Sequence, residues 1–251
     1  MTAIPRISIE NVTKRFGSQT VLDGVDLQIP QGQSLVIIGQ SGCGKSVLIK
    51  HIIRLLTPDS GRIVVDGEDV STIRSRNLPD FRRKFGMLFQ GAALFDSMSV
   101  FDNIALGLRE QRRHPEKKIR EIVLEKIEMV GLSGSETKGP AELSGGMRKR
   151  VGLARAIAHD PEVMLYDEPT TGLDPVTADV INDLIVELNQ KLHVTSVTVT
   201  HDMVSAFKIA ERIVMLDNGK VAFDGTPDEV EQTSHPQVKG FMISSGIRGK
   251  H

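Results

Sequence analysis

Apolar and polar residues alternate near the start of the chain, at residues 7–12 and again at residues 25–29. This period of two is typical of antiparallel strands that bury one face and expose the other. Residues 61–67 have the same character and are bounded by glycines, which favour turns. The pattern therefore predicts an antiparallel β-region in the N-terminal part of the chain.

Continuous apolar runs occur at residues 34–38, 85–89 and 163–166. Short runs without alternation are typical of strands that are buried on both faces, as in a parallel sheet. Residues 194–200 are rich in β-branched side chains, which also favour a strand. Together these segments predict the mixed, mainly parallel core sheet of an α/β protein.

From about residue 100 to residue 159 the pattern changes to that of helices. Apolar residues recur there at steps of three and four, with charged residues between them: Ile119, Ile122, Val123, Ile127 and Val130. We therefore expect one domain over residues 1–251, with a helical subdomain at about 91–160 inserted into it. The charged stretch 109–120 is either the solvated face of this subdomain or a nucleic-acid patch. No aromatic residue interleaves it, which favours the solvated face.

Shorter helices are expected in four places outside this subdomain, at 47–56, 202–210, 227–232 and 236–244, before a polar tail. The first of them follows a glycine-rich loop, and the second follows the strand expected at 194–200.

The composition narrows the classes of function. The net charge of −1 gives no general attraction to nucleic acid or to an anionic membrane surface. The single cysteine, Cys43, excludes an intramolecular disulfide and favours a small filler residue over a redox sensor. We expect no signal peptide at residues 1–6 and no membrane-spanning helix. The chain is therefore expected to be cytoplasmic, and any membrane part must come from another polypeptide.

The glycine-rich loop lies between the strand at 34–38 and a helix, which is the context of a phosphate-binding P-loop. Backbone N–H groups and the positive end of the helix dipole suit a polyphosphate. We expect Lys45 to reach the β- and γ-phosphates and the Ser46 hydroxyl to coordinate Mg²⁺. The residues assigned to nucleotide binding here are Gly39, Gln40, Ser41, Gly42, Cys43, Gly44, Lys45, Ser46 and Val47.

Two carboxylates follow the buried run at 163–166. We expect Asp167 to hold Mg²⁺ through water and Glu168 to act as the general base that polarises the attacking water. His201 follows the strand at 194–200, and ligands of open α/β sheets gather at the carboxyl ends of strands. These positions predict an ATP-hydrolysing site.

A second glycine-containing segment, Ser144-Gly145-Gly146, opens a helix whose first turn carries Arg148, Lys149 and Arg150. Positive side chains there oppose the helix dipole, a conflict that a docked anion would remove. Alternatively, Ser144 is only a capping residue followed by flexible glycines.

In their order along the chain, these motifs resemble those of the ATP-binding cassette (ABC) family. The resemblance implies an α/β P-loop NTPase fold with a mixed parallel core sheet, an antiparallel β-subdomain and an inserted helical subdomain. It implies ATP and Mg²⁺ as cofactors, and a homodimer in which Ser144, Gly145 and Gly146 contact ATP held by the second copy.

Four further roles rest on this resemblance. Gln90 matches the glutamine that approaches the metal and the attacking water, so that Ser46, Gln90 and Asp167 form the metal set. His201 matches the histidine that contacts the γ-phosphate, and Asp174 belongs to the loop that runs along the dimer seam. Phe16 stands where a tyrosine often stacks on adenine, although it can equally be a core residue. Met147 departs from the family's usual glutamine.

Segments 46–51, 90–98 and 144–153 further resemble the ATPases of the Mla/Mce lipid-transport systems. This implies a role in phospholipid transport between inner and outer membranes, which maintains outer-membrane lipid asymmetry. It also implies a permease of the MlaE type, a small STAS-domain protein and an Mce-domain substrate-binding protein as partners. The chain would then lie peripherally on the cytoplasmic face of the inner membrane and bind no nucleic acid.

Two other functions share the catalytic motifs. One is the ATPase of an importer for amino acids or other polar solutes. The other is a soluble ABC ATPase that acts on DNA or ribosomes, which the single cassette and the net charge of −1 disfavour. The small apolar segment 91–95 is expected either to line a groove for a permease coupling helix or to pack at the base of the helical subdomain.

Overall fold

The computed structural model describes residues 5–246, and the chain forms two compact units. The first unit consists of the residues up to Arg82 together with those from His193 onward, and the second is Arg83–Leu192. The expected absence of a signal peptide concerns residues 1–6, and residues 1–4 of that segment lie outside the described range. The polar tail beyond residue 246 also lies outside it.

The antiparallel region belongs to the first unit. Its strands are β1 (Ile7–Phe16), β2 (Gln19–Ile29), β4 (Ser60–Val65) and β5 (Glu68–Asp69), in the spatial order β2-β1-β4-β5. Ile7 pairs with Ile29 on one side and with Val65 on the other, and all three side chains are buried. The alternating pattern therefore predicted these strands and their buried face.

A mixed sheet completes the first unit. It contains β3 (Ser34–Ile38), β8 (Thr195–Thr200), β9 (Arg212–Asp217) and β10 (Lys220–Gly225). Strand β3 is parallel to both β8 and β9, and β10 pairs with β9 in an antiparallel hairpin. The hairpin was not among the predicted strands. Its turn is formed by Asn218 and Gly219, both with positive φ, as a tight two-residue hairpin requires.

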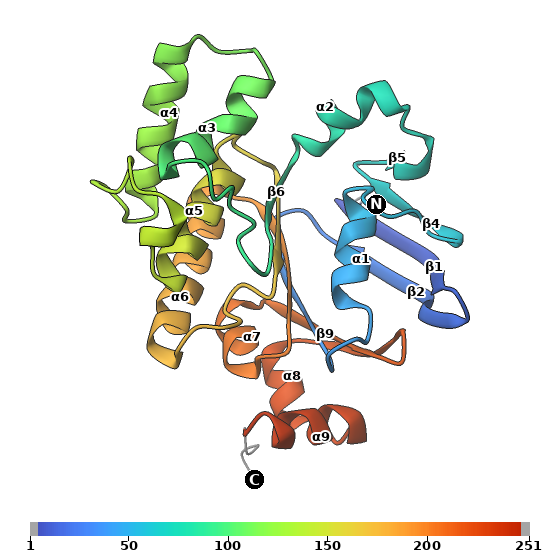
Figure 1. Ribbon diagram of the computed structural model, residues 1–251. Helices are drawn as coiled ribbons and strands as arrows, with labels where there is room; N and C mark the ends of the chain where they lie inside the picture. The colour runs from blue at the N-terminus through green and yellow to red at the C-terminus, as the bar shows by residue number, and fades with distance from the viewer. Residues whose placement is uncertain (1–4, 247–251) are drawn as a thin grey trace. The chain divides into compact units, whose positions relative to one another are not determined.

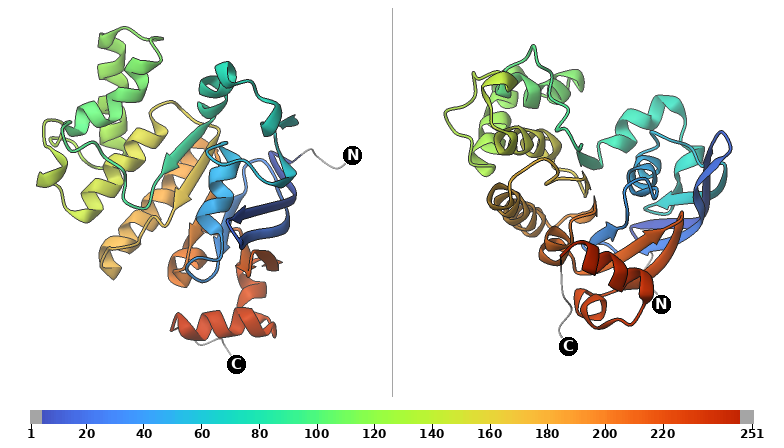
Figure 2. Two further views of the ribbon diagram at one scale, coloured as in Figure 1. Left: turned by 45° about the vertical axis from the view of Figure 1, so that its right-hand side comes forward. Right: turned by 60° about the horizontal axis from the view of Figure 1, so that its bottom comes forward.

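Several helices belong to the first unit. They are α1 (Lys45–Ile52), α2 (Leu78–Arg82), α7 (Met203–Ile209), α8 (Pro227–Gln232) and α9 (Pro236–Ser244), with short 3₁₀ turns at Val70–Thr72 and Ser75–Asn77. Helices α8 and α9 have the predicted bounds and follow one another at the C-terminal end of the ribbon (Figure 2). Helix α1 ends earlier than predicted because Arg54 adopts a left-handed conformation, with φ of 52°.

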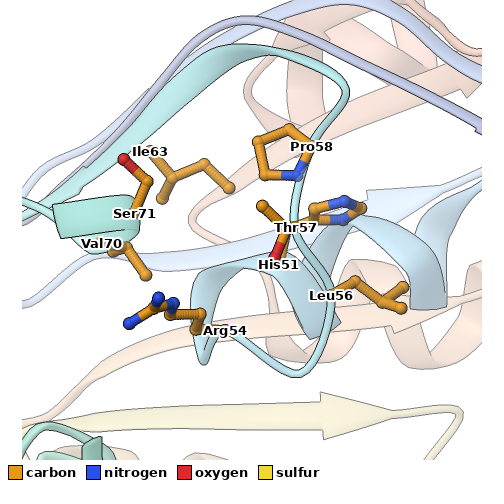
Figure 3. A pocket seen from close by; sticks show the side chains of 8 residues that line it. All are labelled: His51, Arg54, Leu56, Thr57, Pro58, Ile63, Val70 and Ser71. Atoms are coloured by element: carbon orange, nitrogen blue, oxygen red, sulfur yellow. The ribbon is translucent and has the colours of Figure 1, made fainter. Parts of the chain in front are cut away.

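A cavity of about 10 Å³ lies beside the C-terminal end of α1, and Figure 3 shows the side chains around it. His51 of α1 lines it together with Thr57 and Ile63. The His51 side chain is 1% exposed, and its Nδ1 lies 2.7 Å from the carbonyl oxygen of Val47, one turn earlier. The ring is therefore a buried part of the first unit.

The second unit combines a parallel strand pair with helices. Strands β6 (Phe85–Leu88) and β7 (Val163–Asp167) are parallel, as predicted. The helices are α3 (Val100–Glu110), α4 (Glu116–Met129), α5 (Gly145–Ile157) and α6 (Pro175–Leu192), with a 3₁₀ turn at Pro140–Glu142. Helices α3, α4 and α5 pack against one another, and α5 also packs against β6 and α6 (Figure 1).

The apolar positions that predicted the helical region face its interior. Ile119, Val123 and Ile127 of α4 are each at most 2% exposed. Both units thus combine helices with parallel strands, and the α/β class is confirmed. Among residues 5–246, no helix is both long and apolar enough to cross a membrane.

Candidate nucleotide-binding site

The glycine loop joins β3 to α1 in the first unit. Gly44 takes the N-cap position of α1 with φ of 106°, and no side chain caps the helix. A Cβ at Gly44 would lie 2.8 Å from the carbonyl oxygen of Val21, so a larger residue does not fit without a shift. Gly42 also has positive φ, with open space around the position of a Cβ. The loop therefore leaves the positive end of α1 uncovered by side chains, which fits a phosphate group.

Lys45 carries its charge into this loop. Its residue is 5% exposed, and its Nζ donates to the carbonyl oxygens of Gly39 at 2.8 Å and Gln40 at 3.1 Å. Carbonyl oxygens solvate the ammonium without cancelling its charge, so the loop keeps a net positive centre. Burial raises the pKa of the neighbouring Cys43 thiol, which disfavours a reactive thiolate and agrees with a small filler residue.

His201 lies at the same sheet edge as the glycine loop. Ile38 of β3 pairs with Thr200 of β8, so Gly39 and His201 each follow directly after a paired residue. The chain then turns into α7, where the Asp202 side chain accepts hydrogen bonds from the N–H groups of Val204 and Ser205. The structure thus brings the predicted phosphate loop and the predicted histidine to adjacent strand ends.

Phe16 ends β1 in the same unit. It is 46% exposed, and the Nζ of Lys14 lies 5.6 Å from the centre of its ring. The alternative that Phe16 is a core residue is therefore wrong. A ring face that already attracts a cation is suited to stacking, although its role toward adenine stays a prediction.

Gln90, Asp167 and Glu168 meet at a strand edge of the second unit. Leu88 of β6 pairs with Tyr166 of β7, and the three polar residues follow within two positions of this pair. Asp167 and Glu168 are 6% and 8% exposed, whereas Gln90 is exposed. The Thr171 hydroxyl donates to Oε2 of Glu168 at 3.0 Å. Two carboxylates and an amide thus gather at one sheet edge, as predicted.

The backbone of Glu168 is strained. Its φ is 49°, in the left-handed region that residues with a side chain avoid. Such conformations cost about 1–3 kcal/mol and persist only where the surroundings hold them. The carbonyl oxygen of Glu168 accepts hydrogen bonds from the Thr171 N–H at 3.3 Å and from the Nζ of Lys149 at 3.1 Å. The general base predicted from the sequence therefore has a specially supported main chain.

Lys149 was not among the predicted site residues. It is 5% exposed, and its Nζ donates to the carbonyl oxygens of both Gln90 and Glu168. Burial lowers the pKa of this ammonium to about 8, although the charges of Glu168 and Asp167 raise it. Its spacing from the buried residues Gly146 and Leu153 indicates its place on the inner face of α5, a signal that the basic composition of the turn conceals.

The other basic residues of this turn show that the expected anion is not required to offset their charge. Arg148 donates to the Leu143 carbonyl at 2.7 Å, and Arg150 donates to the Val130 carbonyl at 3.4 Å. Backbone carbonyls thus bind all three basic side chains, so their position near the helix N-terminus needs no external anion. The Ser144 hydroxyl accepts from the Met147 N–H at 3.2 Å and therefore caps α5. It still has a hydrogen to donate, so contact with phosphate remains a separate prediction.

Asp174 also has a structural role. Its carboxylate accepts hydrogen bonds from the N–H of Thr177 at 3.0 Å and from the Thr177 hydroxyl at 2.6 Å. These hydrogen bonds hold the pKa of Asp174 below its usual range. They fix the start of α6, and contact of Asp174 with a nucleotide stays a prediction.

The segment that follows Gln90 is held by two side chains. Ala92 and Ala93 have φ of 59° and 47°, and the Arg155 guanidinium donates to both of their carbonyl oxygens. Asn103, fully buried, bonds to the N–H and the carbonyl of Phe95. Within this segment Leu94 is half-buried and Phe95 is 49% exposed. The segment thus has a fixed backbone and one exposed aromatic ring.

Known proteins are similar to most of this chain. The family model described as ABC transporter matches residues 22–171, a range that leaves out Phe16, Asp174 and His201. The chain is 42% identical to the intermembrane phospholipid transport system ATP-binding protein MlaF of Haemophilus influenzae, over 94% of this chain and 89% of that protein. It is equally identical to the probable ribonucleotide transport ATP-binding protein mkl of Mycobacterium leprae, over 94% of this chain and 68% of that protein.

Solved structures agree with the fold. The dimeric post-hydrolysis structure of the ATP-binding cassette MJ0796, bound to ADP and Pi, has a TM-score of 0.81 at 33% identity and covers 88% of this chain and 98% of that one. The structure of cbiO1 from Clostridium perfringens, part of an ABC transporter complex, has a TM-score of 0.83 at 28% identity and covers 96% of both chains.

Proposed function

Because this chain belongs to the ABC transporter family, as an ATP-hydrolysing subunit, we propose that it powers phospholipid transport between the inner and outer membranes. The observation that carries the proposal is the 42% identity to MlaF over 94% of the chain. The two sheet edges described above support the chemistry. The first carries the glycine loop and His201, and the second carries Gln90 and both carboxylates.

In this proposal, the first unit binds ATP. The N–H groups of the glycine loop and the Lys45 ammonium bind the β- and γ-phosphates, and Phe16 stacks on the adenine. His201 contacts the γ-phosphate. All of these groups are positive, donate hydrogen bonds or present an aromatic face, which is the chemistry that a nucleoside triphosphate requires.

The carboxylates of the second unit carry out hydrolysis. Glu168 accepts a proton from the attacking water, and Gln90 orients that water through its amide. Ser46, Gln90 and Asp167 offer a hydroxyl, an amide and a carboxylate oxygen, the hard ligands that Mg²⁺ prefers. When bound, Mg²⁺ neutralises charge on the phosphate oxygens.

The working form is a homodimer. Ser144, Gly145 and Gly146 of one copy contact the ATP that is bound by the other copy, and Asp174 lies near the seam. The dimeric form of the relative MJ0796 supports this arrangement. A permease of the MlaE type supplies the membrane-spanning part, and a STAS-domain protein and an Mce-domain substrate-binding protein complete the assembly. The chain then lies peripherally on the cytoplasmic face of the inner membrane.

The test of the catalytic assignment is Glu168→Gln, which keeps the shape of the side chain and removes the base. We expect ATP affinity to stay within twofold and hydrolysis to fall by on the order of 10²–10⁴. ATP should then hold the dimer together in size-exclusion chromatography. The matched control is Glu187→Gln, at an exposed carboxylate of α6, which should hydrolyse normally. Normal turnover by Glu168→Gln would refute the assignment.

Transport of a polar solute is a second candidate, which the similarity to mkl supports. The two functions differ in what stimulates hydrolysis. With the permease reconstituted in vesicles, phospholipid transport predicts ATP-dependent movement of a labelled phospholipid. A ribonucleotide importer would instead accumulate labelled ribonucleotide and leave the lipid in place.

A further inference from the structure

We propose that Lys149 is a positioning residue for ATP hydrolysis, which fixes the main chain of Gln90 and the main chain of Glu168 relative to each other. The inference rests on the proposed roles of those two residues. Lys149 lies in α5, whereas Gln90 follows β6 and Glu168 follows β7. One ammonium group therefore joins three separate segments of the second unit.

The burial of this ammonium costs free energy. The residue is 5% exposed, so its charge is withdrawn from water, and an apolar side chain of similar length would avoid that cost. The two hydrogen bonds to carbonyl oxygens offset part of the cost. Lys149 is thus better explained by what it holds in place than by a contribution to folding.

The main chain of Glu168 is strained, and that of Gln90 leads into a second strained segment. Glu168 has φ of 49°, and the segment after Gln90 continues into the positive φ angles of Ala92 and Ala93. A residue in such a conformation stays there only where its surroundings hold it, and at Glu168 the hydrogen bonds to its carbonyl oxygen are part of that support. When the peptide turns, the side chain turns with it, so the carboxylate of Glu168 depends on the hydrogen bond to its own carbonyl oxygen.

The expected consequence is a loss of turnover with little loss of ATP binding. Two of the three ammonium hydrogens of Lys149 are donated to the carbonyl oxygens of Gln90 and Glu168, so its proposed role is to position these residues rather than to bind phosphate. A small displacement of a general base lowers the rate by on the order of 10–100-fold. Substitution of Lys149 should therefore lower kcat and leave the Kd for ATP within about twofold.

The variant that tests this is Lys149→Met, which keeps the length of the side chain and removes its donors. Lys149→Gln retains an NH₂ group with two N–H donors for the carbonyl oxygens. We expect its kcat to be at least threefold higher than that of Lys149→Met. The matched control is Arg150→Met, which removes a neighbouring donor from the Val130 carbonyl instead. It should change kcat by less than twofold. Equal loss in Lys149→Met and Lys149→Gln would overturn the role of the donor.

A double-mutant cycle separates positioning from a general effect on folding. If Lys149 acts mainly through Glu168, then Lys149→Met should lower the residual hydrolysis of Glu168→Gln by a smaller factor than it lowers hydrolysis by the wild type. An additive loss would overturn the inference. The failures are distinguishable: normal turnover by Glu168→Gln removes the proposed catalytic role. Normal turnover by Lys149→Met, with Glu168→Gln inactive, removes only the role of Lys149.

Discussion

At the scale of residues, two buried ammonium groups, those of Lys45 and Lys149, bind backbone carbonyls. Lys45 donates to the carbonyls of Gly39 and Gln40, and Lys149 donates to those of Gln90 and Glu168. Lys126 differs, because its ammonium lies between the carboxylates of Glu125 and Asp160. A carbonyl dipole solvates a cation without neutralising it, so Lys45 keeps the charge that an anionic ligand requires.

We expect Lys45→Ala to abolish tight ATP binding, because it removes the charge that pairs with the β- and γ-phosphates. Titration with a fluorescent ATP analogue should show a Kd at least 100-fold higher than that of the wild type. Lys50→Ala, in the last turn of the same helix, should bind ATP normally. Wild-type affinity in Lys45→Ala would remove the phosphate-loop assignment.

His51 gives a prediction for stability against pH. Burial lowers its pKa from the usual 6.5, so the folded protein disfavours the protonated ring that the unfolded chain accepts. Its contribution to stability is therefore present above pH 6.5 and is lost as the pH falls below that value. None of the residues lining the small cavity in Figure 3 carries a carboxylate, and the charge of the nearby Asp59 only partly offsets the effect of burial on the pKa of the ring.

Urea unfolding of wild type and His51→Gln at pH 7.5 and pH 5.5 checks this. The free energy of unfolding should fall less for the variant on acidification, because glutamine takes up no proton. The pKa of His159 is also lowered by burial, but His159 is present in both proteins and cancels in the comparison. An equally steep fall in both proteins would contradict the prediction.

At the scale of elements, periodicity predicted most of the strands and helices. Local backbone geometry explains where the observed elements differ from the predicted ones. The alternation around Ile7 and the helical spacing around Val123 each reflect one buried face, which a sequence records directly. The left-handed conformation of Arg54, which shortens α1, depends on packing and leaves no pattern in the sequence. The β9–β10 hairpin did leave one, the Asn218-Gly219 turn.

The candidate site shows the same division. The glycine loop, the two carboxylates and His201 were predicted from phosphate chemistry and their places after strands, whereas the roles of Phe16, Gln90 and Asp174 followed from the family resemblance. From the sequence, Lys149 is only one of three positive side chains that oppose the helix dipole. Its true partners are two carbonyls that lie 59 and 19 residues away along the chain. No local pattern indicates such contacts.

At Gly86, strand β6 and helix α5 approach each other closely. A Cβ there would lie 2.4 Å from the carbonyl oxygen of Ala156 in α5 and equally close to the sulfur of Met164. We expect Gly86→Ala to destabilise the protein by about 1–3 kcal/mol through overpacking. Gly240→Ala, in α9 with open space around it, should be neutral or slightly stabilising. Urea unfolding curves of both variants provide the measurement.

At the scale of the whole molecule, the proposed function requires a permease as the membrane-spanning partner. The segment 91–95 after Gln90 is the proposed contact, and its fixed backbone exposes the ring of Phe95. Leu94 is half-buried, so an acidic substitution there would disturb folding as well as binding. Phe95 offers the cleaner test, because Asn103 holds its main chain rather than its side chain.

We expect Phe95→Asp to weaken co-purification with the permease at least tenfold, because a charge replaces apolar contact area. ATP binding by the isolated subunit should be unchanged. Leu55→Asp, at a residue of similar exposure in the first unit, is the control and should assemble normally. Normal assembly of Phe95→Asp would place the permease contact elsewhere.

Helix α5 begins at Ser144, which is proposed to touch the ATP of the partner copy, and one turn later its Lys149 holds Glu168, which is proposed to act on the ATP of its own copy. If both proposals hold, the first turns of α5 in each copy connect one nucleotide to the other. In the proposed homodimer, twofold symmetry gives one such connection in each direction between the two nucleotides. The proposed contacts therefore predict that cleavage of ATP at one site acts on the support of Glu168 at the other.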